Sequence, residues 1–247
     1  MSLASLQIRY LFGAAIVLPF VPFLYLQARY VRRSVGRLPD AAGETVGKHG
    51  EHAGEIKLLT VGESTVAGVG AANHTEALTG QFAKHLSAAT RKSVHWRALG
   101  ESGITVRETL QRLVPRLPDE PFDVILIALG GNDVFALSSP RRWRREMTKL
   151  LAILTEKYPT AEILVANVPM VRDFRAMPNP LRFVLSRLAR LQHFNSREFV
   201  APLENAYYFD RVKRVDDDFF SDGIHPSSLG YDLWARDLAE FLRDGKS

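Results

Sequence analysis

Apolar and polar residues follow two different periods along most of this chain. Five short apolar runs have the length of buried strands. They span residues 56–61, 94–99, 122–129, 161–166 and 206–209. Between and after them, apolar residues recur every three or four positions, as on amphipathic helices. These helical patterns cover residues 76–89, 106–117, 139–158, 178–197 and 234–242.

Strands that alternate with helices predict an α/β fold with a parallel sheet covered on both faces. The run over residues 122–129 is almost entirely apolar, as central parallel strands are. We therefore expect one α/β domain over residues 55–247. In such sheets, ligands bind beyond the carboxyl ends of the strands. Residues that follow the strands are the first places to look for chemistry.

The N-terminal part has a different pattern. Residues 10–28 contain no charged side chain. A helix of this length would rise roughly 28 Å, which is close to the thickness of a bilayer core. Pro19 and Pro22 would kink it, as membrane helices tolerate, and no cleavage site of a signal peptide follows. We expect residues 1–33 to form a hydrophobic anchor with a basic flank, the alternative being a helix in the membrane interface or packed on protein.

Four arginines follow the apolar segment, whereas only Arg9 precedes it. They are Arg29, Arg32, Arg33 and Arg37. By the positive-inside rule, this asymmetry favours a catalytic domain on the cytoplasmic face, with the exported side as the alternative. Residues 34–54 are rich in Gly, Ala, Glu and His without an apolar period, so we expect a flexible linker there.

Composition narrows the function classes. The chain of 247 residues has no cysteine, which excludes disulfides, thiolate metal sites and cysteine nucleophiles. Its net charge of +5 is partly local, with a second cluster at Arg141, Arg142, Arg144 and Arg145. This cluster leaves open a membrane-surface scaffold. It is not interleaved with a nucleic-acid-reading motif, so nucleic-acid binding is not expected. The sequence does not predict the oligomeric state.

Polar motifs follow the predicted strands and precede the last helix. They are Gly62-Glu63-Ser64, Gly100-Glu101-Ser102-Gly103, Gly130-Gly131-Asn132-Asp133 and Asp222-Gly223-Ile224-His225. Each motif alone is typical of an ordinary turn. Together they place a hydroxyl, an imidazole, a carboxylate and an amide at one edge of a parallel sheet. Their combination is therefore more informative than any one of them.

These residue types fit acyl transfer. Ser64 needs a base to act as a nucleophile at neutral pH, and His225 is the natural candidate because imidazole side chains in general titrate close to neutral pH. Asp222 can accept a hydrogen bond from the other ring nitrogen and orient the imidazole. The backbone N–H groups of Ser64 and Gly100 and the side-chain amide of Asn132 are the expected donors to the oxyanion.

On these residues the chain resembles the SGNH hydrolases of the GDSL esterase/lipase superfamily. The family is named for a serine, a glycine, an asparagine and a histidine, which match Ser64, Gly100, Asn132 and His225. The resemblance covers residues 56–245. It implies a three-layer α/β/α sandwich of the flavodoxin-like SGNH type, and hydrolysis of esters or thioesters without a metal or other cofactor. The chain departs from the family at Glu63, where the family usually has aspartate.

The substrate is less defined by the sequence. Met170, Phe174 and Met177 follow a predicted strand and could line an acyl pocket, or pack as ordinary core. No long lid is evident, which favours short to medium acyl chains. We expect a serine carboxylesterase that forms an acyl-enzyme. The alternatives are a lysophospholipase or thioesterase, a carbohydrate O-acetyl esterase, and a membrane-tethered binding module without catalysis.

Overall fold

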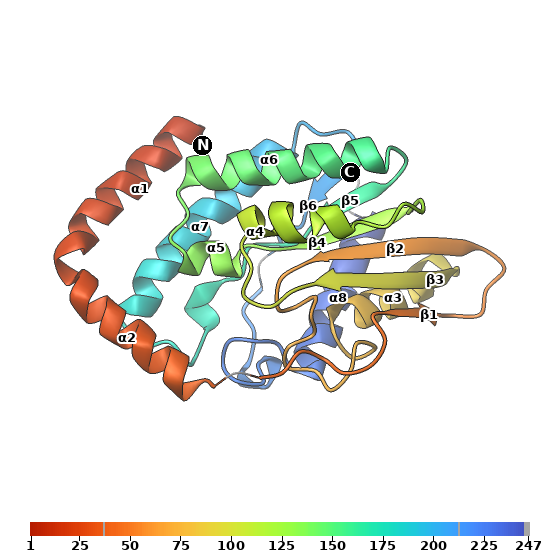
Figure 1. Cartoon of the computed structure of the whole chain (residues 1–247), viewed down its shortest axis with the longest axis horizontal. Helices are drawn as coiled ribbons and strands as arrows, with labels where there is room; N and C mark the ends of the chain where they lie inside the picture. The colour runs from red at the N-terminus through yellow and green to blue at the C-terminus, as the bar shows by residue number, and fades with distance from the viewer. Residues whose placement is uncertain (37, 212, 245–247) are drawn as a thin grey trace.

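The fold is built on one sheet in a computed structural model that describes residues 1–36, 38–211 and 213–244 (Figure 1). The strands are β1 (Val46–His49), β2 (Glu55–Gly62), β3 (Ser93–Gly100), β4 (Val124–Ala128), β5 (Glu162–Val165) and β6 (Ala206–Tyr208). Their order is β1-β3-β2-β4-β5-β6. Strands β2 to β6 are parallel, and β1 is antiparallel to β3. The order of the parallel strands is that of flavodoxin-like folds, which confirms the predicted fold class.

The register aligns the ends of the central strands. Strand β2 pairs with β3 on one side and with β4 on the other, so that Gly62 lies opposite both Gly100 and Ala128. All five residues of β4 are buried, as its continuous apolar sequence predicts. The segments that follow these three strands therefore begin at the same edge of the sheet.

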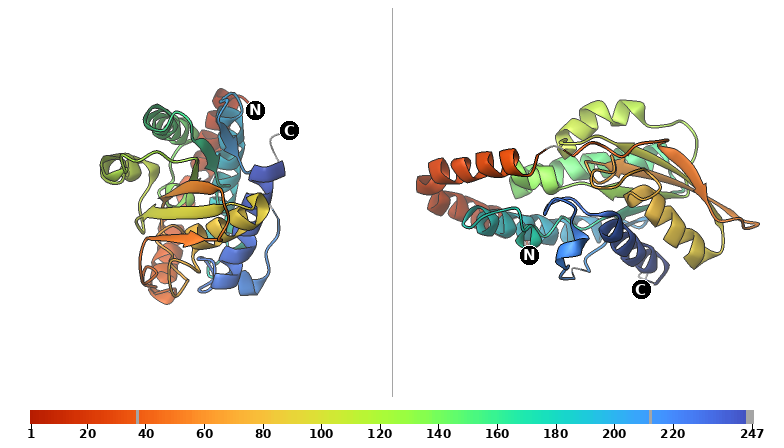
Figure 2. Two further views of the ribbon diagram at one scale, coloured as in Figure 1. Left: turned by 90° about the vertical axis from the view of Figure 1, so that its right-hand side faces the viewer. Right: turned by 90° about the horizontal axis from the view of Figure 1, so that it is seen from below.

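Helices cover both faces of the sheet (Figure 2). One face carries α3 (Leu78–Thr90) and α8 (Ser228–Asp244), and the other carries α4 (Val106–Arg112), α5 (Gly131–Phe135), α6 (Pro140–Lys157) and α7 (Leu181–Val200). Single 3₁₀ turns occur at η1 (Leu18–Phe20), η2 (Val114–Arg116), η3 (Val171–Asp173) and η4 (Asp217–Phe219). The result is the expected three-layer arrangement.

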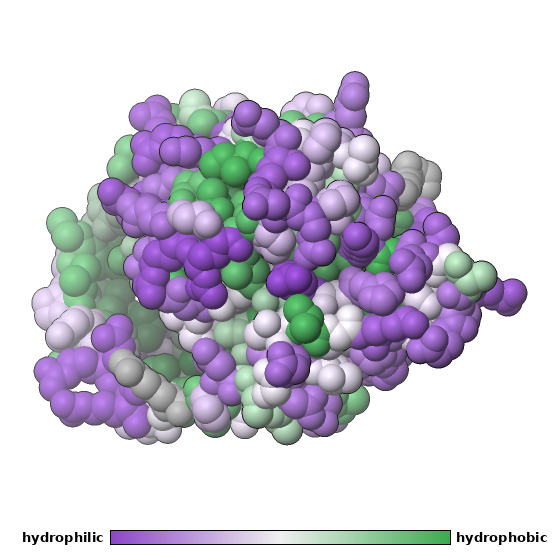
Figure 3. Space-filling model, turned by 45° about the vertical axis from the view of Figure 1, so that its right-hand side comes forward, coloured by the Kyte–Doolittle hydropathy of each residue, from purple (hydrophilic) through white to green (hydrophobic). Residues whose placement is uncertain are grey.

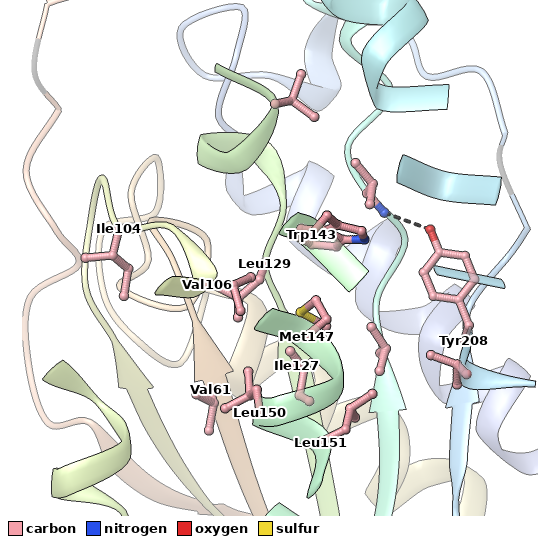
Figure 4. Close-up of a cluster of buried hydrophobic side chains, with 14 of the residues drawn as sticks. Val61, Ile104, Val106, Ile127, Leu129, Trp143, Met147, Leu150, Leu151 and Tyr208 are labelled. Carbon is pink, nitrogen blue, oxygen red and sulfur yellow. Dashed lines mark hydrogen bonds between the residues drawn. The ribbon is translucent and has the colours of Figure 1, made fainter. Parts of the chain in front are cut away.

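The larger of the two cores lies under α6 (Figure 4). Met147 and Leu150 of α6 are fully buried among side chains of the sheet. Trp143 donates from Nε1 to Ser196 Oγ at 2.9 Å, which fixes α6 against α7. Truncation of a buried Leu or Met of this kind typically costs about 2–5 kcal/mol, so this layer is a rigid support for the sheet edge.

The N-terminal segment forms two helices joined by a kink. Helices α1 (Leu3–Val17) and α2 (Val21–Ser34) flank η1, which contains Pro19. Proline lacks the N–H group that continues a helix, which accounts for the bend. The pair lies alongside α7 in both views (Figures 1 and 2), and α1 also contacts α6.

We expected residues 34–54 to form a flexible linker, but part of this segment belongs to the sheet. Residues 46–49 form β1, where Val46 pairs with Arg97 and His49 pairs with Val94. Upstream, the N–H of Ala41 donates to the carbonyl of Ala67 at 2.9 Å. An edge strand needs only one partner and can be polar, so its sequence does not show an apolar pattern. Arg37, the last of the predicted flanking arginines, lies outside the described residues.

Candidate active site

The structure brings three separate sequence motifs to one cavity at the carboxyl edge of the sheet. Its volume is about 830 Å³, and Ser64, Asn132 and His225 all contribute to its lining. Ser64 follows β2, Asn132 lies at the start of α5 after β4, and His225 lies in the loop before α8. This is where ligands bind in open parallel sheets.

A tight turn presents Ser64. The carbonyl of Glu63 accepts hydrogen bonds from the N–H groups of Val66 and Ala67, at 2.9 and 3.0 Å. Gly62 precedes this turn, and a Cβ at that position would lie 2.2 Å from the carbonyl oxygen of Ala128. Only glycine allows this approach of the two strands. The chain can therefore leave β2 abruptly and place Ser64 on the cavity.

The imidazole of His225 is held by Asp222. His225 Nδ1 lies 2.7 Å from Asp222 Oδ2. The other oxygen, Oδ1, accepts hydrogen bonds from the backbone N–H groups of Ile224 and His225, at 2.9 and 2.7 Å. With the proton on Nδ1, the lone pair of Nε2 is free to take a proton.

Asp222 is suited to remain charged. Burial alone would raise the pKa of Asp222, but the hydrogen bonds from the His225 ring and from the two backbone N–H groups outweigh burial and hold the pKa below its usual value. The carboxylate therefore keeps its charge at neutral pH and can stabilise a protonated imidazole.

Glu63 connects the serine turn to the asparagine motif. Its Oε1 accepts from the N–H of Gly131 at 2.8 Å, and its Oε2 accepts from the N–H of Asn132 at 2.9 Å. Asn132 Nδ2 also donates to Glu63 Oε2, and to the carbonyl of Ile104 at 3.1 Å. The glutamate thus reaches the asparagine motif from the position where the resembling family usually has aspartate. Asn132 Nδ2 can donate to an oxyanion only if it shares or releases its hydrogen bond to Glu63 or to Ile104.

Two buried carboxyl groups lie in this part of the site. Burial raises the pKa of Glu63 to about 7, although hydrogen bonds from Asn132 and Gly131 oppose this change. Burial also raises the pKa of Asp133 to about 6, against a hydrogen bond from the N–H of Val106. Both groups therefore bind protons more tightly in the folded chain than in the unfolded chain.

We expect this proton binding to make stability depend on pH. A carboxyl group with a raised folded pKa stabilises the fold fully below its unfolded pKa, and this stability is lost as the pH rises through the folded pKa. For Glu63, the change from 4.5 to about 7 corresponds to roughly 3 kcal/mol. Urea unfolding between about pH 5 and pH 8 should show a falling free energy of unfolding. In Glu63→Gln the fall should be shallower, with Asp133 contributing the remainder. Equal slopes in both proteins would show that Glu63 does not titrate in this range.

The glycine that we predicted as an oxyanion donor lies outside the cavity. Among the described residues that line the cavity, Gly103 is present and Gly100 is not. Gly100 packs against the serine turn, where a Cβ would lie 2.5 Å from the backbone nitrogen of Ala67. Gly103 has φ +83°, and a Cβ there would meet nothing within 4 Å. Both glycines belong to the motif Gly100-Glu101-Ser102-Gly103, so the sequence alone does not choose between them.

Substitution of the two glycines should separate their roles. Gly100→Ala forces backbone atoms apart, so we expect it to lower the free energy of unfolding by about 1–3 kcal/mol or more. Gly103→Ala carries only the strain of a positive φ, roughly 1 kcal/mol, and should mainly reduce turnover. Urea unfolding and ester hydrolysis of both variants check this. If Gly100→Ala were the more stable of the two variants and lost more turnover than Gly103→Ala, Gly100 would again be the preferred oxyanion donor.

Comparison with known proteins agrees with this arrangement. The sequence model of the GDSL-like lipase/acylhydrolase family matches residues 60–233, which is well over half of the chain. The chain belongs to this family. It is a family of ester-hydrolysing enzymes, so this hydrolase is an enzyme of that class. No curated protein sequence matches the chain.

Solved structures show the same fold at low sequence identity. TesA shares 20% identity and a TM-score of 0.57, over 75% of this chain and 97% of its own. An acetylxylan esterase from Geobacillus stearothermophilus shares 18% and 0.51, over 80% and 98%. A phospholipase A1 from Streptomyces albidoflavus shares 16% and 0.55, over 75% and 98%. The two described activities differ, so the fold does not define the substrate.

Two of the three residues predicted to line an acyl pocket of the hydrolase lie on the cavity. Met170 and Phe174 line the cavity. Met177 does not line it among the described residues, because its side chain is buried in the core beside α7. The apolar wall also includes Phe135 and Phe220, whose rings lie 6.4 and 5.7 Å from that of Phe174. Sequence analysis missed these two aromatics because Phe135 at the end of α5 and Phe220 after η4 come from distant segments that only the fold brings together.

Within the part of the chain that the structure describes, no three His, Asp or Glu side chains gather in a way that could hold a metal ion.

Proposed function

We propose that the chain is a serine ester hydrolase that works through an acyl-enzyme. The observation that carries the proposal is that Ser64 and His225 line one cavity and that Asp222 holds the His225 ring at 2.7 Å. A hydroxyl and an imidazole that a carboxylate orients, both on one cavity, are the groups that a serine nucleophile requires.

The reaction follows from these groups. Ser64 Oγ attacks the acyl carbon while His225 Nε2 takes the hydroxyl proton. The oxyanion is stabilised by the N–H groups of Ser64 and Gly103 and by the amide of Asn132. The intermediate then collapses, and the alcohol leaves with the proton from His225. Water, activated by the same imidazole, attacks the acyl-enzyme and releases the acid and the free serine.

We propose carboxylic esters with short to medium acyl chains as the substrates. Phe135, Phe174 and Phe220 give the cavity an aromatic wall that fits an acyl chain better than a sugar ring with its hydroxyl groups. A lysophospholipid or an acyl thioester would present the same acyl group. Among the structural neighbours, the phospholipase A1 represents an acyl-lipid substrate and the acetylxylan esterase a carbohydrate acetate.

Membrane association belongs to the same proposal. The described chain has one helical segment, Leu3–Ser34, that is long and apolar enough to cross a membrane, and signal sequences share these properties. We propose that residues 10–28 hold the enzyme at a membrane. The arginines that follow this segment favour a catalytic domain on the cytoplasmic face, because the lipids of that face carry negative charge.

Covalent labelling tests the proposed nucleophile directly. A fluorophosphonate reacts with an activated serine hydroxyl but not with ordinary serines. We expect one label per chain, located by peptide mass spectrometry on Ser64, and loss of ester hydrolysis in proportion to labelling. A folded protein that takes no label and hydrolyses no ester would support the non-catalytic binding module instead. Labelling at a different serine would remove Ser64 from the mechanism.

A further inference from the structure

The N-terminal helices contribute to the catalytic cavity itself. Val31, Arg32 and Val35 at the end of α2, with Leu38 just beyond it, line the same cavity as Ser64 and His225. Val31 is buried in the main core, and Val35 packs against that core. One wall of the site is thus made by a segment outside residues 60–233, the part that the family shares.

Each of the two N-terminal helices is hydrogen-bonded to the catalytic domain. In α1, Gln7 accepts a hydrogen bond from the N–H of Arg141, and Tyr10 donates to the carbonyl of Leu137 at 2.8 Å. In α2, Gln27 donates to the carbonyl of Asn179 at 2.7 Å and accepts from the N–H of Leu181 at 3.0 Å. A helix that crosses a bilayer needs about 20 consecutive residues that can lie in the hydrocarbon core, away from the rest of the domain. These contacts leave no such stretch.

The outward face of the same helices is apolar. Ile8, Leu11, Phe12, Ile16, Phe20 and Phe23 are between 52% and 69% exposed. Apolar side chains gather at the left edge of the molecule in Figure 3, where these helices lie. Contiguous apolar surfaces of this kind mark interaction sites for membranes or proteins.

Charge selects a membrane as the partner. The chain contains no acidic residue before Asp40, whereas Arg29, Arg32 and Arg33 are all exposed on α2. Each such arginine contributes about 1 kcal/mol to binding at an anionic bilayer surface. By contrast, the arginines of α6 are partly used within the domain, since Arg142 pairs with Glu146 and Arg144 donates to Asn195. The surface that combines exposed apolar side chains with exposed positive charge is therefore that of α1 and α2.

We propose that α1 and α2 lie in the surface of an anionic bilayer without crossing it, and that the end of α2 guides the acyl chain of a membrane-resident ester from the lipid to Ser64. This inference rests on the ester-hydrolase function proposed above. It makes Val35 and Leu38 determinants of acyl-chain length, and it makes the N-terminal segment part of the substrate site as well as an attachment.

Cysteine labelling tests the placement of the helices. The natural chain has no cysteine, so single Ala4→Cys and Ser34→Cys variants of the full-length protein each carry one thiol. The protein is bound to sealed vesicles of phosphatidylcholine and phosphatidylglycerol and treated with a membrane-impermeant maleimide. Both thiols should react in intact vesicles, because both helix ends lie on the side of the domain. Reaction of Ala4→Cys only after detergent is added would show that the segment crosses the bilayer.

Vesicle flotation tests the lipid partner. The double variant Phe12→Ser, Ile16→Ser should bind the same vesicles at least about tenfold more weakly, while hydrolysis of a soluble short ester is unchanged. Val46→Ser, a matched exposed apolar position on β1, should bind as the natural chain does. If the natural chain does not float with vesicles but forms dimers that the double variant lacks, a second copy covers this face and the proposal is wrong.

Acyl-chain selectivity tests the cavity wall. With p-nitrophenyl esters in detergent, Val35→Trp should lower the ratio of kcat/KM for the longest accepted chain to that for the acetate about tenfold or more. Val35→Ala should extend the accepted length. Opposite shifts cannot come from general misfolding. If selectivity were unchanged in both variants while hydrolysis still depended on Ser64, the role of α2 in guiding the acyl chain would be wrong, and the proposed ester-hydrolase function would stand. Absence of any ester hydrolysis would instead remove the proposed function, and the labelling result would still report on the helices.

Discussion

Ser64→Ala is expected to reduce kcat for ester hydrolysis by roughly 10⁶-fold, which is the scale of nucleophile loss in a serine hydrolase. Alanine removes the only atom that forms the covalent bond to the acyl group, whereas the turn around it depends on backbone hydrogen bonds at Glu63. The fold should therefore persist. Hydrolysis of p-nitrophenyl acetate and butyrate by the purified full-length protein, with circular dichroism as the check on folding, measures this loss.

A second serine on the cavity provides the matched control. Ser102 also lines the cavity, and its Oγ donates to an exposed Asp40 carboxylate. An exposed hydrogen bond of this kind is worth about 1 kcal/mol, so Ser102→Ala should retain turnover within about tenfold. If Ser64→Ala lost no more activity than Ser102→Ala, the hydrolysis would not pass through an acyl-enzyme on Ser64.

The fold and the positions of the candidate catalytic side chains could be predicted from the sequence because each depends on a local pattern. The apolar run of β4 and the helical periods of α6 and α7 determine the layers. The polar motifs lie directly after strands, so the parallel topology alone brings Ser64 and Asn132 to one edge. No knowledge of distant contacts was needed for these steps.

The errors of sequence analysis concern contacts between distant segments. Gly100 and Gly103 both fit the motif, and only the packing of Gly100 against Ala67 shows which one lies behind the turn. Strand β1 is defined by backbone pairing with β3, which leaves no apolar pattern in the sequence. The charge-free segment over residues 10–28 has the composition of a membrane span, and that composition does not show that Gln27 within it and Gln7 just before it bond to the domain. A composition average cannot reveal that only one face of a helix is covered.

Asp222→Asn is expected to lower kcat by about 10³–10⁴-fold while leaving the loop intact. The substituted amide can keep its oxygen in the place of Oδ1, where it still accepts from the N–H groups of Ile224 and His225. Its NH₂ group then faces His225 Nδ1 in place of Oδ2. Because an amide nitrogen donates and does not accept, Nδ1 must lose its proton and Nε2 must carry it.

The loss in Asp222→Asn would therefore come from the wrong tautomer of His225. An Nε2 that already carries a proton has no lone pair to take one from Ser64, so the ring proton must first move to Nδ1, where it would face the amide NH₂ group instead of a carboxylate. Fluorophosphonate labelling should slow by a similar factor, because it depends on the same proton transfer. Asp222→Ala makes a useful comparison, since it also removes the acceptor for both backbone N–H groups and should lower stability as well as activity. Nearly full labelling and turnover in Asp222→Asn would show that His225 is oriented by its surroundings without this carboxylate.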